Sequence, residues 1–455
     1  MTSVVLPALR NEMPGAARSP AVAETRERTL HPWVVVLAAG YLVAVLFSKW
    51  NAPAILVTGI SAVVFAVRFI VRGKIDRIGW GVIVYLLALT GYGIAVGSAP
   101  TLAGLGRFLS FEGRPYVAYL PALVLATAAV TDRDLDAVRT LMRWSVVFGA
   151  ALVVAWLAVG PSVLGRGGNF TGFASSHHAS GFFFAIAGLV LLVPADGGRR
   201  SMDVALGVIA FGIVVASGSR TSMAGLLVAA IYLVVSAPSL RRKLRLVLLT
   251  GAAAMLALLL SGKFFETVQY LGSSAFLQGA TIEFSQGATP EQGKGLSGVS
   301  SPNGTIANIL IRFGVWRASE EEFTKSPLIG IGPWRLNDTD RHEVGVPGLM
   351  MLATGGERVS GSGFGAHNLV LETLAETGVL GLALLAAPWW LLIARLRRQR
   401  RWGRAAISLI AFGVGTLATS NAMISPALCF PLFVFAMAAA RVVPGANATD
   451  PVHQA

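Results

Sequence analysis

Three short polar segments of the sequence contain residue types that could carry chemistry. The first is Ser217-Gly-Ser-Arg-Thr-Ser222, which places Arg220 between two apolar runs. A guanidinium at a membrane surface is costly unless it is paired or hydrated. It could be a fixed fork that binds a diphosphate, or an arginine at a helix end that extends to water. The position of Arg220 alone leaves both interpretations open.

The second segment is Ile311-Arg-Phe-Gly-Val-Trp-Arg317. It lies in a stretch, 305–324, whose apolar residues recur at helical spacing. Arg312 could bind an anion, or it could be a solvated residue of an amphipathic helix close to Glu320 or Glu321. Arg317 lies nearer the centre of the apolar stripe, so either arginine could point inward.

The third segment begins with His367-Asn368, where an apolar run starts. A neutral histidine at the mouth of a helix can act as a general base, and the alternative is that the two residues cap the helix. Glu376 follows two turns into the run, half a turn out of phase with His367, so we do not expect it to orient that histidine. An ionisable side chain at this depth is a functional hypothesis, here as a partner between helices.

The remaining metal-ligand residue types do not form a convincing site. The single cysteine, Cys429, stands inside an apolar run. His177 and His178 are adjacent and would diverge by about 100° on a helix, which makes a poor chelate. Asp338-Thr-Asp340 is a lone acidic pair and indicates surface polarity. We therefore expect no metal and no cofactor.

The composition indicates whether water or lipid surrounds most of the chain. Of the 455 residues, 54% are hydrophobic and 13% are charged, with a mean hydropathy of +0.66. Soluble domains carry about 25% charged residues, so we expect a membrane protein. The net charge of +14 comes from short basic clusters between apolar runs. That distribution is typical of membrane orientation and argues against nucleic-acid binding.

Apolar runs long enough to cross about 30 Å of hydrocarbon recur along the chain. Because helices satisfy their own backbone groups in lipid, the runs predict an all-α polytopic membrane protein with about twelve transmembrane helices. The predicted spans are 32–48, 53–71, 78–97, 115–131, 144–160, 178–195, 203–218, 222–237, 246–261, 368–394, 405–421 and 425–441.

The orientation follows from the basic residues of the short loops. With the N-terminus inside, the inner loops hold 18 Lys and Arg residues, including Arg139 and Arg143, and the short outer loops hold 5. The positive-inside rule then places both termini in the cytoplasm.

The predicted order of segments follows from these spans. It comprises a disordered cytoplasmic tail at 1–31, spans one to nine within 32–261, a large and partly helical periplasmic loop at 262–366, spans ten to twelve within 367–441, and a cytoplasmic tail at 442–455. Within the large loop, residues 327–334 predict a turn-rich stop.

Taken together, the three polar segments resemble the O-antigen ligase and polysaccharide polymerase superfamily. The likeness rests on the Ser217–Thr221 turn, on Arg312 a few residues before Trp316, on Pro327-Leu-Ile-Gly-Ile-Gly332, and on the H-N-x-x-L-x-x-L-x-E-x-G pattern from His367 to Gly378. It covers about residues 165–395 in detail. Residues 172–180, with His177 and His178, depart from the usual Asn-containing turn, and their role is left open.

The resemblance implies a reaction and a location. The family transfers a glycan from a polyprenyl diphosphate to a sugar hydroxyl on a glycan or glycolipid acceptor, without a metal, at the outer face of the bacterial inner membrane. Carried over by motif, Arg220 and Arg312 would bind the diphosphate and His367 would be the base, with Arg317, Asn368 and Glu376 as possible supporting residues.

Two matters stay open at this point. A twelve-span secondary transporter or flippase is the alternative, although such proteins often show two related halves with ionisable sites near the midplane. Within the family, the sequence does not separate a ligase from a polymerase or a protein-glycan transferase. It also leaves the sugar, the linkage and the oligomeric state undetermined.

Overall fold

The computed structural model describes residues 51–96, 114–128, 130–160, 164–166, 169–172, 174, 176–193, 201–237, 316, 319–333, 335, 368–399, 401–417 and 426–442. The predicted first and ninth spans, the tail at 1–31, the tail at 442–455 apart from its first residue, and most of the predicted loop at 262–366 lie outside the described residues. Of the sequence-predicted site residues, Arg220, Asn368 and Glu376 are described, whereas Arg312, Arg317 and His367 are not.

The described part of the chain is mostly helical, which confirms the predicted helical character of the fold. A short antiparallel hairpin pairs β1 (Gly165–Arg166) with β2 (Asn169–Phe170). The helices are α3 (Asn51–Arg72), α4 (Arg77–Ala95), α6 (Arg114–Ala126), α7 (Asp132–Val159), α9 (His177–Leu192), α10 (Ser201–Ala216), α11 (Arg220–Val235), α17 (Leu369–Leu396), α18 (Gly403–Thr416) and α19 (Pro426–Arg441).

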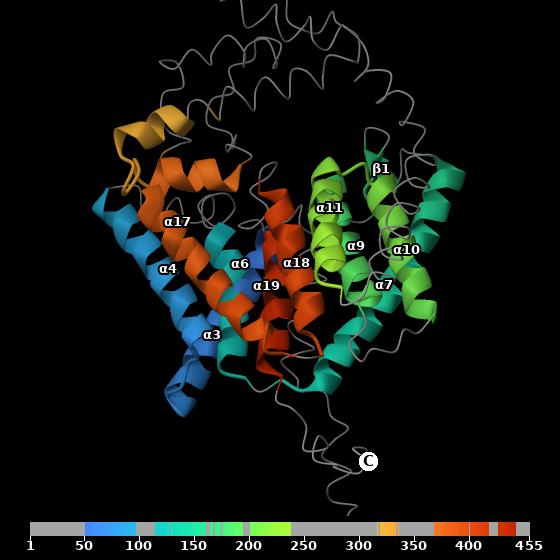
Figure 1. Ribbon diagram of the computed structural model, residues 1–455, viewed down its shortest axis with the longest axis horizontal. Coiled ribbons are helices and arrows are strands. Elements are labelled where there is room, and N and C mark those ends of the chain that lie inside the picture. Colours follow the sequence, from blue (N-terminus) through green and yellow to red (C-terminus); the bar gives the residue numbers. More distant parts are fainter. Residues whose placement is uncertain are drawn as a thin grey trace, which may run out of the picture.

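Several features of these helices are those of a membrane protein. Among the described residues, α4, α7 and α17 are long and apolar enough to cross a membrane, and seven shorter apolar helices accompany them. Consecutive helices run in opposite directions from α3 to α11 and again from α17 to α19 (Figure 1). Ile70, Leu157 and Leu227 are among many large apolar side chains left exposed, which is unusual for a soluble protein. The number of twelve spans stays a prediction.

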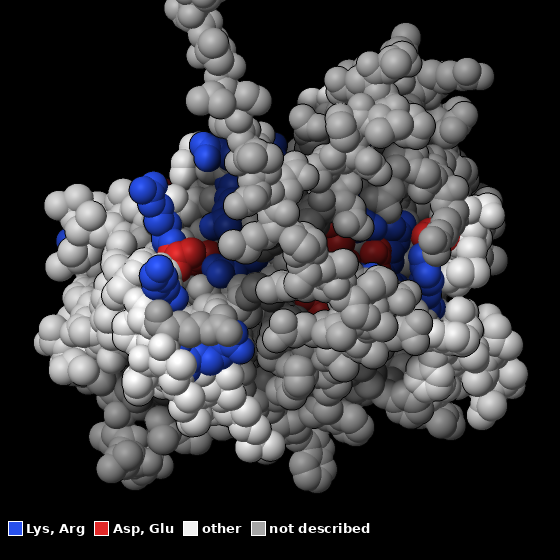
Figure 2. All heavy atoms as spheres, turned by 90° about the horizontal axis from the view of Figure 1, so that it is seen from below, with Lys and Arg blue, Asp and Glu red and all other residues white. Residues whose placement is uncertain are grey.

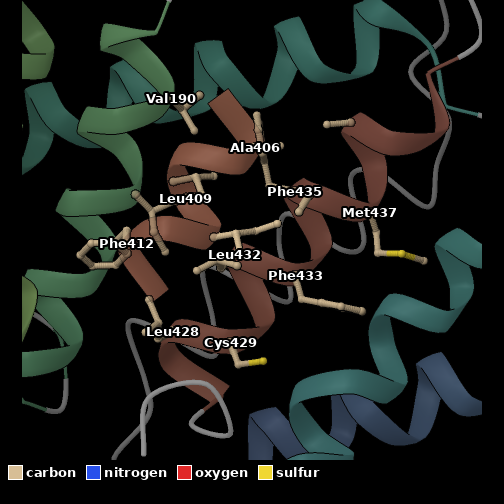
Figure 3. Packing of buried hydrophobic residues seen from close by; sticks show 14 of the residues in the cluster. Val190, Ala406, Leu409, Phe412, Leu428, Cys429, Leu432, Phe433, Phe435 and Met437 are labelled. Atoms are coloured by element: carbon tan, nitrogen blue, oxygen red, sulfur yellow. The ribbon is translucent and has the colours of Figure 1, made fainter. Parts of the chain in front are cut away.

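The centre of the bundle is formed by α18 and α19. Phe412 of α18 and Leu432 and Phe433 of α19 are fully buried there, as Figure 3 shows. Helix α11 packs closely on α18, because a Cβ at Gly225 would lie 2.6 Å from the Phe412 ring and one at Gly415 would lie 2.8 Å from the Cα of Gly225. Small residues allow such close approach between membrane helices. This contact fixes the first half of α11 against the end of α18.

Charged side chains gather at one end of the bundle, the lower end in Figure 1 and the face seen in Figure 2. The arginines come from loops and helix ends that the sequence predicts to share the cytoplasmic side. The groups are Asp76 with Arg395 and Arg441, Asp132 and Asp136 with Arg401, and Asp203 with Arg139 and Arg143. These loops therefore do meet at one end, while the compartment that they face stays a prediction.

Helix α7 differs from the predicted span at 144–160. It begins at Asp132, after a capping box in which Asp134 N donates to Thr131 Oγ1 at 3.4 Å and Thr131 N donates to Asp134 Oδ2 at 2.9 Å. Arg139 and Arg143, which were predicted to lie in an inner loop, thus lie in the first half of this helix. Their side chains can be largely buried because Asp203 neutralises them, with the Arg143 Nε donating to its Oδ1 at 2.6 Å.

Candidate functional site

The polar turn around Arg220 lies at the end of the bundle opposite the charged end. Helix α10 ends at Ala216 and α11 begins at Arg220, so the connection is even shorter than the sequence indicates. Gly218 adopts φ +64°, a conformation that favours glycine. Ser219 is the N-cap of α11, and its Oγ accepts from Ser222 N at 3.3 Å. The side chain of Arg220 is exposed at the first position of the helix.

The serines of this turn are completely buried beneath the exposed arginine. Ser217, Ser219 and Ser222 each have 0% exposure. The Ser219 and Ser222 hydroxyls lie 2.7 Å apart, and Ser217 Oγ donates to Val214 O at 2.5 Å. Buried hydroxyls need partners of this kind. These buried hydrogen bonds therefore fix the backbone that carries Arg220.

The segment whose role the sequence left open surrounds this turn. His178 Nδ1 lies 3.2 Å from Ser219 Oγ. One turn further along α9, a Cβ at Gly181 would lie 2.6 Å from the Ser219 Cβ, so α9 touches the turn directly. From β2, the Asn169 side chain covers Gly218, where a Cβ would come within 2.3 Å of its Oδ1. The hairpin and the start of α9 thus belong to the Arg220 site.

Sequence reasoning did not assign His178 or Asn169 to the site. One local signal was available for His178, because Ser176 precedes the apolar run as an N-cap and its Oγ accepts from Ala179 N at 3.1 Å. A serine at that position marks a helix start. It would have placed both histidines in the first turn of α9, at the same membrane side as Arg220. The contact with Ser219 itself depends on how α9 and α11 pack.

The start of α17 confirms that the His367-Asn368 pair includes a helix cap. Asn368 Oδ1 accepts from Val370 N at 3.1 Å and from Leu371 N at 3.2 Å. Leu369 N donates to Leu417 O at 3.2 Å, which joins the start of α17 to the end of α18. His367 lies outside the described residues, immediately before this cap. Because Asn368 performs the capping itself, a separate role stays available to His367.

Helix α17 is broken at Gly378, where the sequence predicted a continuous span over 368–394. Gly378 has φ +64° and ψ −167°, which are not helical angles. The part before the break lies across the upper end of the bundle, and the part after it descends beside α4 (Figure 1). The predicted span therefore contains a break that was not located from the sequence. Glycine makes the break possible, because other residues are strained at this φ.

The turn-rich segment that follows Ser326 is bound to the break by backbone hydrogen bonds. Ile331 N donates to Ala375 O and Gly332 N donates to Glu376 O, both at 2.9 Å. In the other direction, Val379 N donates to Pro327 O at 3.0 Å and Leu380 N donates to Leu328 O at 3.1 Å. The carbonyl and amide groups freed by the break therefore find hydrogen-bond partners in the segment 327–332.

Glu376 lies in the part of α17 before the break and is half-buried. The sequence placed it two turns inside a span, and the structure places it two residues before the break at Gly378. Its backbone carbonyl accepts from Gly332 N. Tyr92 Oη of α4 donates to Gly330 O at 3.0 Å and ties the same segment to α4. Glu376 is thus part of the joint that holds the start of α17.

Helices α9, α11 and α17 are among those that begin at this end of the bundle (Figure 1). Helix α18 ends between the last two, contacting Gly225 of α11 through Gly415 and Leu369 of α17 through Leu417. Helix N-termini carry partial positive charge and favour anions. With the exposed Arg220, this end can attract a phosphate-bearing ligand. In the described part of the chain, no group of three or more His, Cys, Asp or Glu could hold a metal ion.

The comparisons with known proteins give one family match. A search of the curated proteins finds no match to the chain. The O-antigen ligase family model matches residues 205–386. The matched region contains Arg220, the segment 327–332 and the broken start of α17, and it lies within the resemblance expected for residues 165–395. The match supports the resemblance of this part of the chain to the O-antigen ligase-like superfamily.

Proposed function

We propose that this membrane protein is a glycosyltransferase of the ligase or polymerase type. It moves a glycan from a polyprenyl diphosphate to a hydroxyl of an acceptor glycan or glycolipid. The observation that carries the proposal is the family match, because residues 205–386 include all three polar segments that could do this chemistry. The packing around Arg220 and Asn368 adds support, since both residues start helices at the end of the bundle where α18 ends.

The donor diphosphate binds at Arg220 and Arg312. Arg220 is exposed at the N-terminus of α11, so its guanidinium and the helix dipole favour the same anion. A planar guanidinium forms two parallel hydrogen bonds to phosphate oxygens. Arg312 provides the second cation, and Arg317 is a supporting residue at most. Together these groups stabilise the charge that develops on the departing diphosphate.

His367 acts as the general base. The acceptor hydroxyl gives its proton to the imidazole, and its oxygen forms a bond to the anomeric carbon of the donor sugar. The bond from that carbon to the diphosphate oxygen breaks, and the polyprenyl diphosphate leaves with the bonding electrons. Asn368 helps indirectly, because it caps α17 and so fixes the backbone next to His367. The mechanism uses no metal.

The proposed location is the bacterial inner membrane, with the site on the periplasmic or outer face. There it meets a donor that has already crossed the bilayer. The alternative of a secondary transporter or flippase gains nothing from the family match. The choice of acceptor (a lipid core, a growing polymer or a protein) depends on residues of the protein other than those that bind the diphosphate.

The proposal is tested with purified protein, a polyprenyl-diphosphate-linked glycan and an acceptor glycolipid. We expect one polyprenyl diphosphate released for each glycan transferred, with the rate unchanged by EDTA. Uptake of a labelled solute into vesicles without glycan turnover would instead support the transporter. Gel ladders from a deletion strain then separate the two acceptor types. A polymerase mutant keeps one capped repeat unit, whereas a ligase mutant loses every capped form.

A further inference from the structure

A histidine from a different helix contacts the residue immediately before Arg220. His178 Nδ1 lies 3.2 Å from Ser219 Oγ, and Ser219 is the N-cap of α11. The imidazole is half-buried, while Ser219 is fully buried. The first turn of α11, and with it Arg220, therefore depends on a hydrogen bond that comes from the start of α9.

The Ser219 hydroxyl can form a hydrogen bond to His178 Nδ1 whether or not Nδ1 carries a proton. A serine hydroxyl donates one hydrogen and accepts two. Ser219 Oγ already accepts from Ser222 N and lies 2.7 Å from Ser222 Oγ. If Nδ1 is unprotonated, Ser219 donates to it and accepts from the Ser222 hydroxyl. If Nδ1 carries a proton, it donates to Ser219, which then donates to Ser222. Either arrangement satisfies Ser219.

The backbone of α9 reinforces the same contact. Gly181 lies next to the serines, and a Cβ there would come 2.6 Å from Ser219 Cβ, 2.7 Å from Ser222 Oγ and 3.0 Å from Ser217 Oγ. Such a gap leaves no space for a water molecule between α9 and the turn. His178 therefore approaches Ser219 from a fixed distance, and the hydrogen bond is held by the packing of two helices.

We propose that His178 is a positioning residue for the donor site. Through Nδ1 and the Ser219 hydroxyl, it holds the N-terminus of α11 so that Arg220 presents its guanidinium to the donor diphosphate in one orientation. The inference rests on the proposed function, because it assigns His178 a role through Arg220. His178 itself does not touch the reacting atoms.

The side-chain geometry supplies a sharp test. In His178→Asn, the amide group occupies nearly the position of Nδ1 and can still bond to Ser219. In His178→Gln, the amide reaches instead toward the position of Nε2, and in His178→Ala the bond is lost. We expect Ala and Gln to raise the donor KM about 3- to 10-fold, the factor for one lost hydrogen bond. Asn should stay within about twofold, and the acceptor KM should not change in any variant.

A double-mutant cycle shows whether the effect passes through Arg220. In an Arg220→Lys background, His178→Gln should raise the donor KM little further. The planar guanidinium that His178 positions is already absent from this background. Binding of a sugar-free polyprenyl diphosphate, measured per folded molecule, should follow the same order. Independent, multiplicative effects of the two substitutions would overturn the inference. Equal behaviour of Asn and Gln would also overturn it.

These results also separate the inference from the proposed function. If Arg220→Ala weakens donor binding while His178→Gln behaves like the wild type, the inference fails and the donor site stands. If Arg220→Ala leaves donor binding and transfer intact, the proposed role of Arg220 fails, and the positioning role of His178 fails with it.

Discussion

Gly330 and Gly378 form a reciprocal contact in which each glycine lies against the backbone beside the other. A Cβ at Gly330 would lie 2.3 Å from the carbonyl carbon of Glu376, and a Cβ at Gly378 would lie 2.3 Å from that of Leu328. Both glycines have positive φ, +69° and +64°. The contact joins two motifs that are almost fifty residues apart, and it fixes the start of α17 where the proposed base is attached.

The joint should not tolerate a side chain at Gly378. Alanine there would be strained at φ +64° and would collide with Leu328, so we expect Gly378→Ala to destabilise the fold by more than about 2 kcal/mol. The control is Gly212→Ala, since a Cβ at Gly212 meets nothing within 4 Å. It should be neutral or stabilise α10 by up to about 1 kcal/mol. Thermal unfolding in detergent compares the two variants. Equal melting temperatures would contradict the close contact between Gly378 and the backbone of Leu328.

The charged end of the bundle should depend strongly on Asp203. Its carboxylate is 3% exposed and binds both Arg139 and Arg143, so Asp203→Asn leaves two arginines without their counter-ion. Breaking a buried pair costs roughly 3–5 kcal/mol. The matched control is Asp136→Asn, since Asp136 is 47% exposed and its partner Arg401 keeps Asp132. That change should cost under about 1 kcal/mol. Similar losses of melting temperature in both variants would show that the Asp203 group is not structural.

The two proposed diphosphate binders should be indispensable for transfer. Arg220→Ala and Arg312→Ala should abolish or greatly reduce it while the protein still inserts, and the Lys variants should recover part of it, because an ammonium cannot form the planar fork. Arg317→Ala is the control and should keep more activity, since the motif favours Arg312. Transfer is measured per folded molecule. Full activity of Arg220→Ala would remove this residue from the donor site.

The topology predicts which fusion sites reach the outside. A reporter that is active only outside the cytoplasm should be active when fused at Gly295 and silent when fused at Arg398. Arg398 lies in the loop between α17 and α18, which also contains Arg401 of the ion pairs with Asp132 and Asp136. The inverse pattern would place the Arg220 end in the cytoplasm, where a translocated donor is not available.

The sequence predicted the helices of this protein better than their interruptions. Hydropathy located α9, α10 and α11 within a few residues, because a long apolar run in lipid forms a helix to satisfy its own backbone groups. The break at Gly378 was missed. A glycine inside an apolar run also occurs in unbroken helices such as α10, and only the partner segment at 327–332 distinguishes the two cases.

The site was predicted in part for similar reasons. Arg220 and Asn368 start helices as expected, because short polar turns between apolar runs fix their positions. The contact of His178 with Ser219 was not foreseeable, since it arises from the packing of α9 against α11. The helical start of α7 was missed although Thr131 and Asp134 have capping-box spacing, because the span was located from its apolar run alone. The neutralisation of its arginines by Asp203 depends on the tertiary fold.

The most direct test of the proposed mechanism is the turnover of His367→Ala beside that of wild type, with folded protein and donor binding measured on the same samples. We predict a rate lower by about 10²- to 10⁴-fold, as expected for a lost general base, with donor binding largely kept. The wild-type rate should also fall as the pH drops through the range in which histidine takes up a proton. A His367→Ala rate per folded molecule within a few-fold of wild type would contradict the assignment of His367 as the base, and with it the mechanism.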